Sequence, residues 1–402
     1  MERKRKYRRF LMICLALDFL AIGVLGVKYL DRKVPDEIHV EDVSSLNLQE
    51  QIDCPIVQFD EAITASAGNG YTVSSNILGV IPFKDVKVTQ TEREYVYASG
   101  SVIGIYMETD GVLVIDSGEI VQKDGSVKSP AKDIVEAGDY IVAFNEEKIE
   151  NKQDLMQELK NLSNEVVTLQ VKRGKSIIPL SIKPVKDANE NYKLGIWVRD
   201  DTQGLGTLTF VDSQGNYGAL GHGISDIDTG ELLDIQTGKL YGAEILAIKK
   251  GDVGSPGELA GLIRYEKRNV LGSILDNTSC GIFGKLTDIN SNKIELEKMP
   301  IAYKQEVEIG AATILCTIDD EVREYQAEIE KIDMNHEDSN KSFVVRVTDE
   351  ELLAETGGII QGLSGSPIVQ NGKLVGAVTH VLVNDPTRGY GIFIENMLDN
   401  AE

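Results

Sequence analysis

The stretch Gln361-Gly-Leu-Ser-Gly-Ser-Pro367 holds the residues of this chain that are best suited to covalent chemistry. Ser364 stands between glycines in a turn, where the backbone can present a hydroxyl to solvent and point N–H groups the same way. A neutral imidazole can take the proton of such a hydroxyl. His222, one of only four histidines, lies between two glycines. The pair predicts acyl transfer, although an ordinary turn and a structural histidine would use the same residue types.

An imidazole that acts as a base needs an acceptor on its far nitrogen, and several carboxylates are candidates. Asp349 follows the strand-like run 344–347 and precedes the serine by 15 positions (364 minus 349). Asp226 and Asp228 are close to His222 in the sequence, and Asp385 lies before Pro386. We rank Asp349 first, and the spacing alone leaves the others open.

The elements around these residues are short and β-prone. Runs at 368–369 and 374–378 flank Asn371-Gly372, which predicts a hairpin. Many similar runs between residues 194 and 347 predict a β-barrel or a pair of barrels. The order of histidine and then serine is that of chymotrypsin-like double β-barrels, which we expect for residues 187–402.

The serine turn resembles the Gly-Asp-Ser-Gly-Gly-Pro pattern of chymotrypsin-like enzymes. This alignment selects Ser364 over Ser366 as the nucleophile and assigns the oxyanion hole to the backbone N–H groups of Gly362 and Ser364. Leu363 stands where trypsin-like zymogens carry an acidic residue. Activation by an ion pair with a newly freed amino terminus is therefore not expected.

Residues 84–186 are predicted to form a separate β-rich unit. Strand-like runs are followed by Ser129-Pro-Ala and Gly138-Asp-Tyr-Ile141, and then by an amphipathic helix from Lys152 to Leu162. This order resembles a PDZ domain, which holds an extended peptide by strand addition beside a glycine-containing loop. We place that loop at Ser101, Val102, Ile103 and Gly104, although it departs from the usual Gly-Leu-Gly-Phe pattern and a simple closed β core is the alternative.

The N-terminus carries a basic tail followed by an apolar run from Phe10 to about Leu30. Such a run is close to the roughly 20 residues that cross a bilayer, and the basic flank predicts a cytoplasmic N-terminus with the bulk of the chain outside. A cleaved signal peptide would begin in the same way. We expect an uncleaved anchor over residues 1–31, followed by a connector over residues 32–83 that is open to proteolytic clipping.

The charge and the cysteine content of the chain limit the kinds of partner and cofactor that we expect. The 402 residues carry a net charge of -23, which argues against nucleic acid because phosphate binding needs a cationic surface. The four cysteines show no CxxC spacing, so neither a metal nor an organic cofactor is expected. A single disulfide between Cys280 and Cys316 is conceivable outside the cytoplasm.

Four phrases, at 221–224, 277–284, 362–373 and 376–386, resemble the stage IV sporulation protein B peptidases of spore-forming bacteria. With the anchor and the PDZ-like unit, the resemblance covers nearly the whole chain. It implies a membrane-anchored serine endopeptidase of the forespore that acts in the space between the two forespore membranes. Such enzymes cleave themselves and a regulatory protein of an intramembrane metalloprotease complex, which releases processing of a late sigma factor. The resemblance assigns Ser364 as nucleophile, His222 as base and Asp349 as third member.

Two other functions use the same elements. A non-catalytic scaffold would bind a partner through the PDZ-like unit and carry a degenerate peptidase barrel. A broad-specificity quality-control peptidase outside the cytoplasm would share the mechanism and differ in its substrates.

Overall fold

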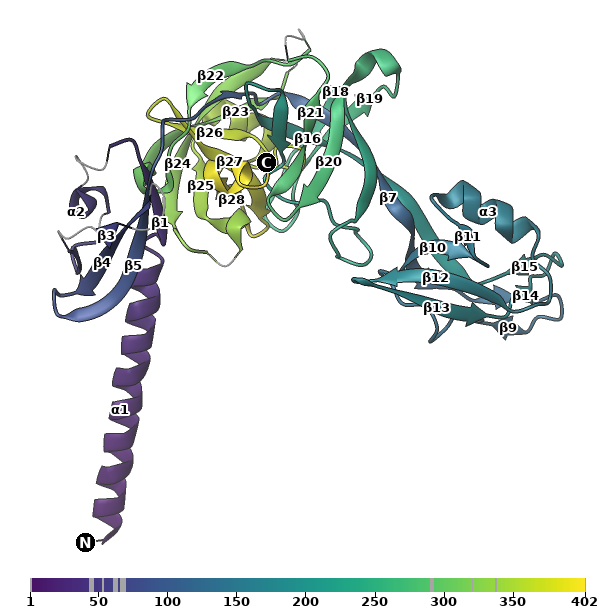
Figure 1. Cartoon of the computed structure of the whole chain (residues 1–402), viewed down its shortest axis with the longest axis horizontal. Coiled ribbons are helices and arrows are strands. Elements are labelled where there is room, and N and C mark those ends of the chain that lie inside the picture. The colour runs from purple at the N-terminus through teal and green to yellow at the C-terminus, as the bar shows by residue number, and fades with distance from the viewer. Residues whose placement is uncertain are drawn as a thin grey trace.

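The computed structural model describes residues 2–42, 47–52, 54–60, 64–65, 70–289, 293–319, 321–336 and 338–401. Figure 1 shows an N-terminal helix as a single rod, a small sheet at its upper end, a central body of two barrels and a smaller β unit on the opposite side. The predicted fold class, a mainly β chain that begins with an apolar helix, is confirmed.

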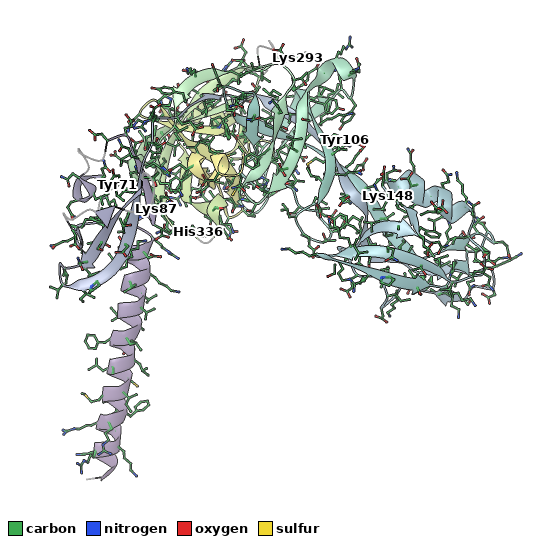
Figure 2. All side chains as sticks on the ribbon, in the orientation of Figure 1. Tyr71, Lys87, Tyr106, Lys148, Lys293 and His336 are labelled. Carbon is green, nitrogen blue, oxygen red and sulfur yellow. The ribbon has the colours of Figure 1, made fainter. Side chains whose placement is uncertain are left out.

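Helix α1 (Glu2–Asp31) is a candidate membrane span, because the stretch Lys4–Asp31 is long and apolar enough to cross a bilayer. None of its most apolar window is buried against the protein, and its side chains stand free along the rod in Figure 2. Apolar side chains on all faces of a helix require an apolar environment. The helix therefore supports the expected anchor, and the choice between an anchor and a cleaved signal peptide stays a prediction.

The segment predicted as a connector folds, in its described part, into a small sheet with strand order β1-β5-β4-β2 and β3 beside β4. Strand β1 runs parallel to β5, with Glu37 opposite Lys87 and Val40 opposite Gln90. Its core comes from short strands far apart in the sequence, so their alternation is hard to recognise before they pair. Positions 43–46, 53, 61–63 and 66–69 of the expected connector lie outside the described residues. The elements are β1 (Glu37–Val40), α2 (Leu48–Gln51), β2 (Val57–Phe59), β3 (Thr64–Ala65), β4 (Gly70–Ile77) and β5 (Ile81–Gln90).

The first barrel has six strands in the order β7-β18-β20-β21-β17-β16, and the pairing of β16 with β7 closes it. Strands β6 and β22 extend its edge beyond β16, and β19 pairs with β18. Ile103, Leu208 and Tyr217 lie in its core. The strands are β6 (Tyr95–Ala98), β7 (Val102–Ser117), β16 (Ile196–Val211), β17 (Asn216–Ala219), β18 (Ile235–Lys249), β19 (Glu258–Ile263), β20 (Val270–Thr278), β21 (Gly281–Leu286) and β22 (Glu297–Pro300), with the 3-10 helix η2 (Lys267–Asn269) before β20.

The second barrel is closed in the order β23-β24-β25-β28-β27-β26. Its β26–β27 hairpin turns at Asn371 and Gly372, whose φ angles of 53° and 72° are those of the predicted Asn-Gly turn. The elements are η3 (Lys304–Glu306), β23 (Gly310–Thr317), β24 (Val322–Ile332), η4 (Ser339–Lys341), β25 (Phe343–Val347), α4 (Glu350–Thr356), β26 (Pro367–Gln370), β27 (Lys373–Leu382), β28 (Asp385–Phe393) and α5 (Ile394–Leu398). Cys280 and Cys316 carry free thiols, so the conceivable disulfide between them is not formed.

The PDZ-like unit is inserted into the first barrel and does not precede it. Strands β7 and β16 pair along nearly their whole length, from Thr207 opposite Val102 to Ile196 opposite Ser117. Ile103, near the start of β7, is buried in the barrel core, whereas Val114, near its end, is buried in the core of the PDZ-like unit. The unit thus begins within β7 and ends within β16, which differs from the expected limits of 84 and 186. Because one strand contributes to both cores, its pattern of apolar and polar residues continues across the domain boundary, and the sequence alone does not mark where one domain ends.

The unit itself is a small sheet covered by helix α3. Asn151 caps α3 by accepting hydrogen bonds from Gln153 N and Asp154 N, while Asp154 reaches back to the backbone of Asn151. Leu155 is buried beneath the helix, as its amphipathic pattern predicts. The elements are β8 (Ile120–Val121), β9 (Val127–Lys128), β10 (Tyr140–Phe144), β11 (Glu147–Lys148), α3 (Lys152–Lys160), β12 (Val167–Arg173), β13 (Ser176–Ile182), β14 (Val185–Lys186) and β15 (Tyr192–Lys193).

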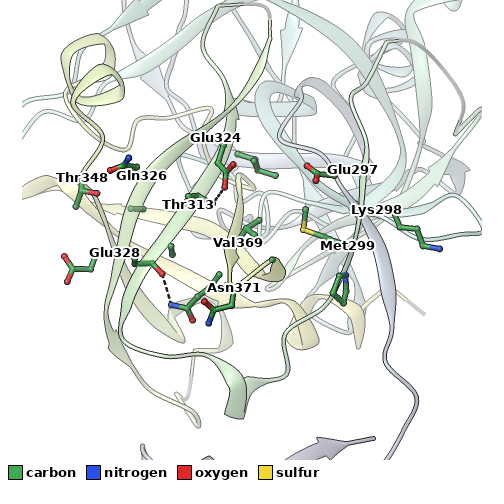
Figure 3. Close-up of a pocket in the computed structure, with 17 residues that line it drawn as sticks. Glu297, Lys298, Met299, Thr313, Glu324, Gln326, Glu328, Thr348, Val369 and Asn371 are labelled. Carbon is green, nitrogen blue, oxygen red and sulfur yellow. Dashed lines mark hydrogen bonds between the residues drawn. The ribbon is translucent and has the colours of Figure 1, made fainter.

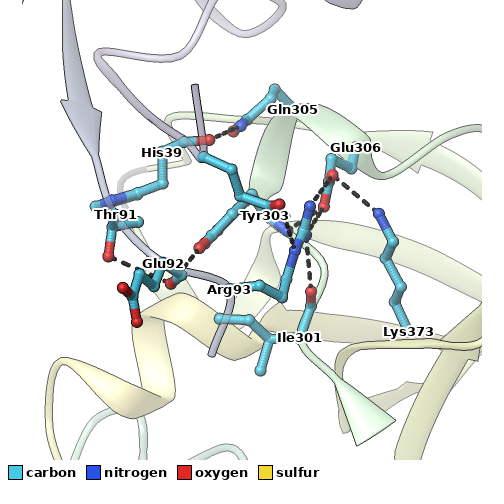
Figure 4. Close-up of polar contacts among 10 residues, drawn as sticks. His39, Thr91, Glu92, Arg93, Ile301, Tyr303, Gln305, Glu306 and Lys373 are labelled. Atoms are coloured by element: carbon cyan, nitrogen blue, oxygen red, sulfur yellow. Dashed lines mark hydrogen bonds and ion pairs between the residues drawn. The ribbon is translucent and has the colours of Figure 1, made fainter. Parts of the chain in front are cut away.

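An ion cluster around Glu306 fastens the chain that leaves the N-terminal sheet to the peptidase body (Figure 4). Arg93 donates two hydrogen bonds to the Glu306 carboxylate, at 2.6 and 2.9 Å, and Lys373 donates a third at 2.9 Å. The Arg93 guanidinium also lies 4.7 Å from the centre of the Tyr303 ring. Burial alone would raise the pKa of Glu306, but the hydrogen bonds from Arg93 and Lys373 outweigh it and lower the pKa to about 2.

Glu306→Gln should therefore destabilise the protein in a pH-dependent way. A carboxyl whose pKa is lowered on folding stabilises the protein above its unfolded pKa, and this contribution is lost as the pH falls through the folded value. The shift from 4.5 to about 2 corresponds to at most about 3 kcal/mol at neutral pH. We expect urea unfolding to show this loss at pH 7 and a shrinking difference from wild type between pH 4.5 and pH 2.

Glu244→Gln is the matched control, because Glu244 pairs with Arg264 on the surface and such pairs contribute less than about 1 kcal/mol. An equal effect of the two substitutions at pH 7 would contradict the role given to Glu306.

Candidate active site

The turn that carries Ser364 is held by the first barrel although it belongs to the second. Gly362 and Gly365 adopt φ angles of 101° and 94°, and a Cβ at Gly365 would lie 2.1 Å from the carbonyl oxygen of Thr207. From β16, Thr207 N donates to Ser364 O at 3.0 Å and Thr207 Oγ1 donates to Gly362 O at 2.8 Å. Thr209 Oγ1 donates to Gly365 O at 2.7 Å. The turn is therefore fixed against the neighbouring barrel by three hydrogen bonds.

The N–H groups of this turn divide into used and unused donors. The N–H groups of Leu363, Gly365 and Ser366 donate to backbone carbonyls within the second barrel. Among the hydrogen bonds that the structure describes, none is donated by the N–H of Gly362 or Ser364. These two unused donors flank the serine, as the predicted oxyanion hole requires.

The two serines of the turn have different surroundings. Ser366 is fully buried, and its hydroxyl oxygen is among the buried atoms without a hydrogen-bond partner. Ser364 lines a cavity of about 490 Å³, and its hydroxyl donates to Thr379 O at 2.7 Å. The structure thus presents Ser364, and not Ser366, to a substrate.

His222 lines the same cavity as Ser364, which brings the two predicted residues to one place. It follows β17 in a turn where Leu220 and Gly221 have φ angles of 69° and 67°. Its Nδ1 lies 2.8 Å from Gly223 O, and since a carbonyl can only accept, Nδ1 carries the proton and Nε2 is left as the basic nitrogen. Burial lowers the pKa of His222, so the neutral, basic form is favoured. To reach this base, the Ser364 hydroxyl must turn away from Thr379 O.

A second imidazole, His380, lies beside the first. The two ring centres are 4.6 Å apart with the ring planes tilted by 33°, and His380 also lines the cavity. Burial and the neighbouring charges of His222 and Lys341 lower the pKa of His380, while Asp338 opposes them. The sequence analysis gave no role to His380, although it directly follows the residue whose carbonyl accepts the serine hydroxyl. Its position in the strand after the serine turn was the available signal.

Asp349 is not brought to His222. It caps helix α4, where its carboxylate accepts hydrogen bonds from Glu351 N at 3.0 Å, Leu352 N at 3.1 Å and Gln326 N at 3.2 Å. It does not line the cavity, and only burial and the Gly223 carbonyl shift the pKa of His222.

The other candidate carboxylates are also engaged elsewhere. Asp226 and Asp228 pair with Arg199, and Asp385 accepts from Thr387 Oγ1 at 2.7 Å. Within the described residues, the group that orients the imidazole is therefore the carbonyl of Gly223.

The predicted PDZ loop is wrong in its position. Val102, Ile103 and Gly104 lie in β7 within the first barrel, paired with both β16 and β18, and Ser101 hydrogen-bonds to Ser99 and to Glu295 N. A strand paired on both sides cannot accept an added peptide strand.

The groove of the PDZ-like unit lies elsewhere, in a cavity of about 640 Å³ between helix α3 and residues 192–198. Gly195 has a φ of 67°, and no described hydrogen bond is donated by the N–H of Leu194 or Gly195. Lys160 and Lys193 line the cavity together with Glu119 and Glu190, and Lys152, also in the lining, pairs with Asp200 at 2.9 Å. Lys193-Leu-Gly-Ile196 is thus the glycine-containing loop, and it lies near the C-terminal end of the unit and not at residues 101–104.

A further cavity of about 690 Å³ lies on the second barrel (Figure 3). Glu297, Glu324 and Glu328 are among its lining residues, and Thr313 Oγ1 donates to Glu324 at 2.6 Å. None of the predicted catalytic residues lines it. Within the described ranges, no three His, Cys, Asp or Glu side chains are grouped so as to hold a metal ion.

Comparison with known families decides the identity of this arrangement. The family model of the SpoIVB peptidase S55 matches residues 190–398, which include strand β16, the serine turn that it holds and His222. The chain belongs to this family. It is a serine peptidase, and the predicted resemblance is confirmed. A search of curated protein sequences found no significant match to this chain.

Solved structures give partial likenesses to members of two folds. The PDZ domain of an SdrC-like protein from Listeria monocytogenes has a TM-score of 0.18 and 25% identity over 22% of this chain and 87% of that one. The corresponding PDZ domain from Listeria innocua has a TM-score of 0.19 and 25% identity over 22% and 94%. The Rv3671c protease in its inactive form has a TM-score of 0.28 and 12% identity over 49% and 84%.

Asp349→Asn tests the place of the carboxylate in this SpoIVB-family peptidase. Asparagine also caps helices through its side-chain oxygen, but the NH2 group that replaces Oδ2 cannot accept from Gln326 N. We expect a loss of about 1 kcal/mol in urea unfolding and a rate of Ser364 labelling by a fluorophosphonate that stays within about tenfold of wild type. A fall of about 10⁴-fold in labelling would instead make Asp349 the group that orients His222.

The pH dependence of labelling is the second test of the site. Because burial lowers the pKa of His222 below its usual 6.5, the imidazole stays neutral to a lower pH than an exposed histidine. We expect the acidic limb of the labelling rate to lie below pH 6.5. A limb above pH 6.5 would show that the imidazolium is stabilised, as a neighbouring carboxylate would do.

Proposed function

We propose that this chain is a membrane-anchored signalling endopeptidase of sporulation. It cleaves itself and a regulatory protein of an intramembrane metalloprotease complex, and so triggers processing of a late sigma factor. Its N-terminus would lie in the forespore cytoplasm and its bulk between the two forespore membranes. Membership of the SpoIVB peptidase family and the apolar helix α1 after a basic tail support this proposal.

The observation that carries the peptidase mechanism is the shared cavity of Ser364 and His222 next to two unused N–H donors. His222 Nε2 takes the proton of Ser364 as the hydroxyl attacks a peptide carbonyl. The resulting oxyanion accepts hydrogen bonds from the N–H groups of Gly362 and Ser364. His222 then gives the proton to the leaving amine, and water hydrolyses the acyl-enzyme by the reverse sequence. The Gly223 carbonyl holds the ring in the required tautomer throughout.

The PDZ-like groove supplies the second half of the proposal. Its open strand edge beside α3 suits an extended peptide, and the unused N–H groups of Leu194 and Gly195 suit a terminal carboxylate. A chain end of the substrate, or of this protein after cleavage, would therefore dock there.

Self-cleavage in membranes tests the function. The full-length wild-type chain should give a shorter product whose N-terminus, determined by mass spectrometry, lies within residues 32–83, and Ser364→Ala should remain full length. In sporulating cells, Ser364→Ala should leave the late sigma factor unprocessed.

Two results would favour the other functions. A wild-type chain that is not labelled at Ser364 by a fluorophosphonate would be a scaffold. Rapid degradation of casein without self-cleavage would indicate a broad quality-control peptidase. Thermal unfolding of Ser364→Ala at the wild-type temperature controls for misfolding.

A further inference from the structure

The tip of the β4–β5 hairpin exposes an apolar cluster that the fold does not use. Leu78 is 68% exposed, Val80 80% and Ile81 57%, and Ile56, 46% exposed, lies beside them because Leu78 N donates to Ile56 O at 2.8 Å. The run from Ile77 to Phe83 contains no charged residue. A contiguous apolar patch of this kind marks a contact with another molecule or with a membrane, unlike single exposed side chains.

The backbone of the tip supports this interpretation. Leu78 and Gly79 have φ angles of 54° and 70°, as in a tight hairpin turn whose first position favours asparagine or aspartate. A leucine in this left-handed conformation is strained and, being exposed, gains no burial within the protein in return. Both its conformation and its exposure are unfavourable unless something outside the protein covers it.

The topology directs the tip toward the membrane side of the molecule. The chain leaves the C-terminal end of α1 and enters β1, which therefore leads away from the candidate membrane span. Because β5 runs parallel to β1, the beginning of β5 points back toward α1. Lys84 confirms the placement, since its Nζ lies 3.0 Å from Asp31 at the end of α1 and 2.7 Å from Asp36.

Strand geometry sets the depth of the tip. Val80 precedes Lys84 by four residues (84 minus 80), which amounts to about 13 Å of extended strand. The tip thus extends past the C-terminal turn of α1, in the direction of the N-terminal end of that helix, as Figure 1 shows for the β4–β5 turn. The charged residues of the hairpin begin at Lys84, at the base of this apolar tip.

We propose that Leu78, Val80 and Ile81, with Ile56 beside them, insert into the lipid leaflet next to the C-terminal end of α1. The partner is the bilayer that α1 crosses, and the chemistry is burial of aliphatic side chains at the boundary between headgroups and acyl chains. The membrane would then hold this protein at two points, a helix and a hairpin tip, with Lys84 at the level of the headgroups.

Depth-dependent fluorescence quenching in the full-length protein, kept uncut by Ser364→Ala, tests this contact. The chain contains a single tryptophan, Trp197, so Trp197→Phe gives a silent background. Val80→Trp is then placed in that background and reconstituted into protein-free vesicles whose acyl chains carry bromine. Leu20→Trp, within α1, reports the inserted anchor, and Ile227→Trp, on an exposed loop of the first barrel, is the matched control for an apolar residue that faces water.

We expect the probe at Val80 to be blue-shifted and quenched about twofold or more relative to the probe at Ile227, in the direction of the probe at Leu20. Quenching at Leu20 without quenching at Val80 would overturn the proposal, because the bilayer would then be reached by the helix alone and the tip would belong to a protein partner. Lack of quenching at Leu20 would also overturn it, since the anchor itself would lie outside the bilayer.

Discussion

The active site depends on the hydrogen bonds by which one barrel holds the serine turn of the other. Thr207 and Thr209 are both buried, and together they satisfy the carbonyls of Gly362, Ser364 and Gly365. Each such bond contributes about 1 kcal/mol, but a carbonyl left without its partner at this depth would cost more. These bonds fix the turn in a conformation in which the N–H groups of Leu363 and Gly365 donate to backbone carbonyls, whereas no described hydrogen bond uses those of Gly362 and Ser364. The oxyanion donors are therefore a consequence of how the two barrels meet.

The histidine environment shows how a peptidase site can do without a nearby carboxylate in the described state. The Gly223 carbonyl fixes the tautomer of His222 as a carboxylate would, but it carries no full charge to stabilise the imidazolium. Burial disfavours a positive charge on His222 and lowers its pKa, and His222 in turn lowers the pKa of the neighbouring His380. His222 is thus kept neutral and ready to accept a proton, but the imidazolium that forms when it does so is stabilised less than it would be by a carboxylate.

The sequence revealed those parts of the site that are local and left out those that depend on long-range pairing. Ser364 and its glycines form a motif within seven residues, and the Asn371-Gly372 turn is equally local, so both could be predicted. The PDZ loop was expected at Ser101–Gly104, a glycine-containing stretch within residues 84–186, and only the pairing of β7 with both neighbours shows that it is unavailable. Asp349 illustrates the same limit, since a carboxylate before a helix is equally suited to capping it.

Strand β16 has one further consequence, because it lies in both functional regions. Its first residue, Ile196, lines the peptide groove of the PDZ-like unit. Thr207, eleven positions later (207 minus 196), donates hydrogen bonds to the turn that carries Ser364. The intervening ladder with β7 is continuous apart from two bulges, so the two ends belong to one stiff rod about 36 Å long. A peptide bound in the groove at Ile196 can thus change the geometry of the oxyanion hole through the strand itself, because the two ends of the strand are joined without a hinge or flexible linker.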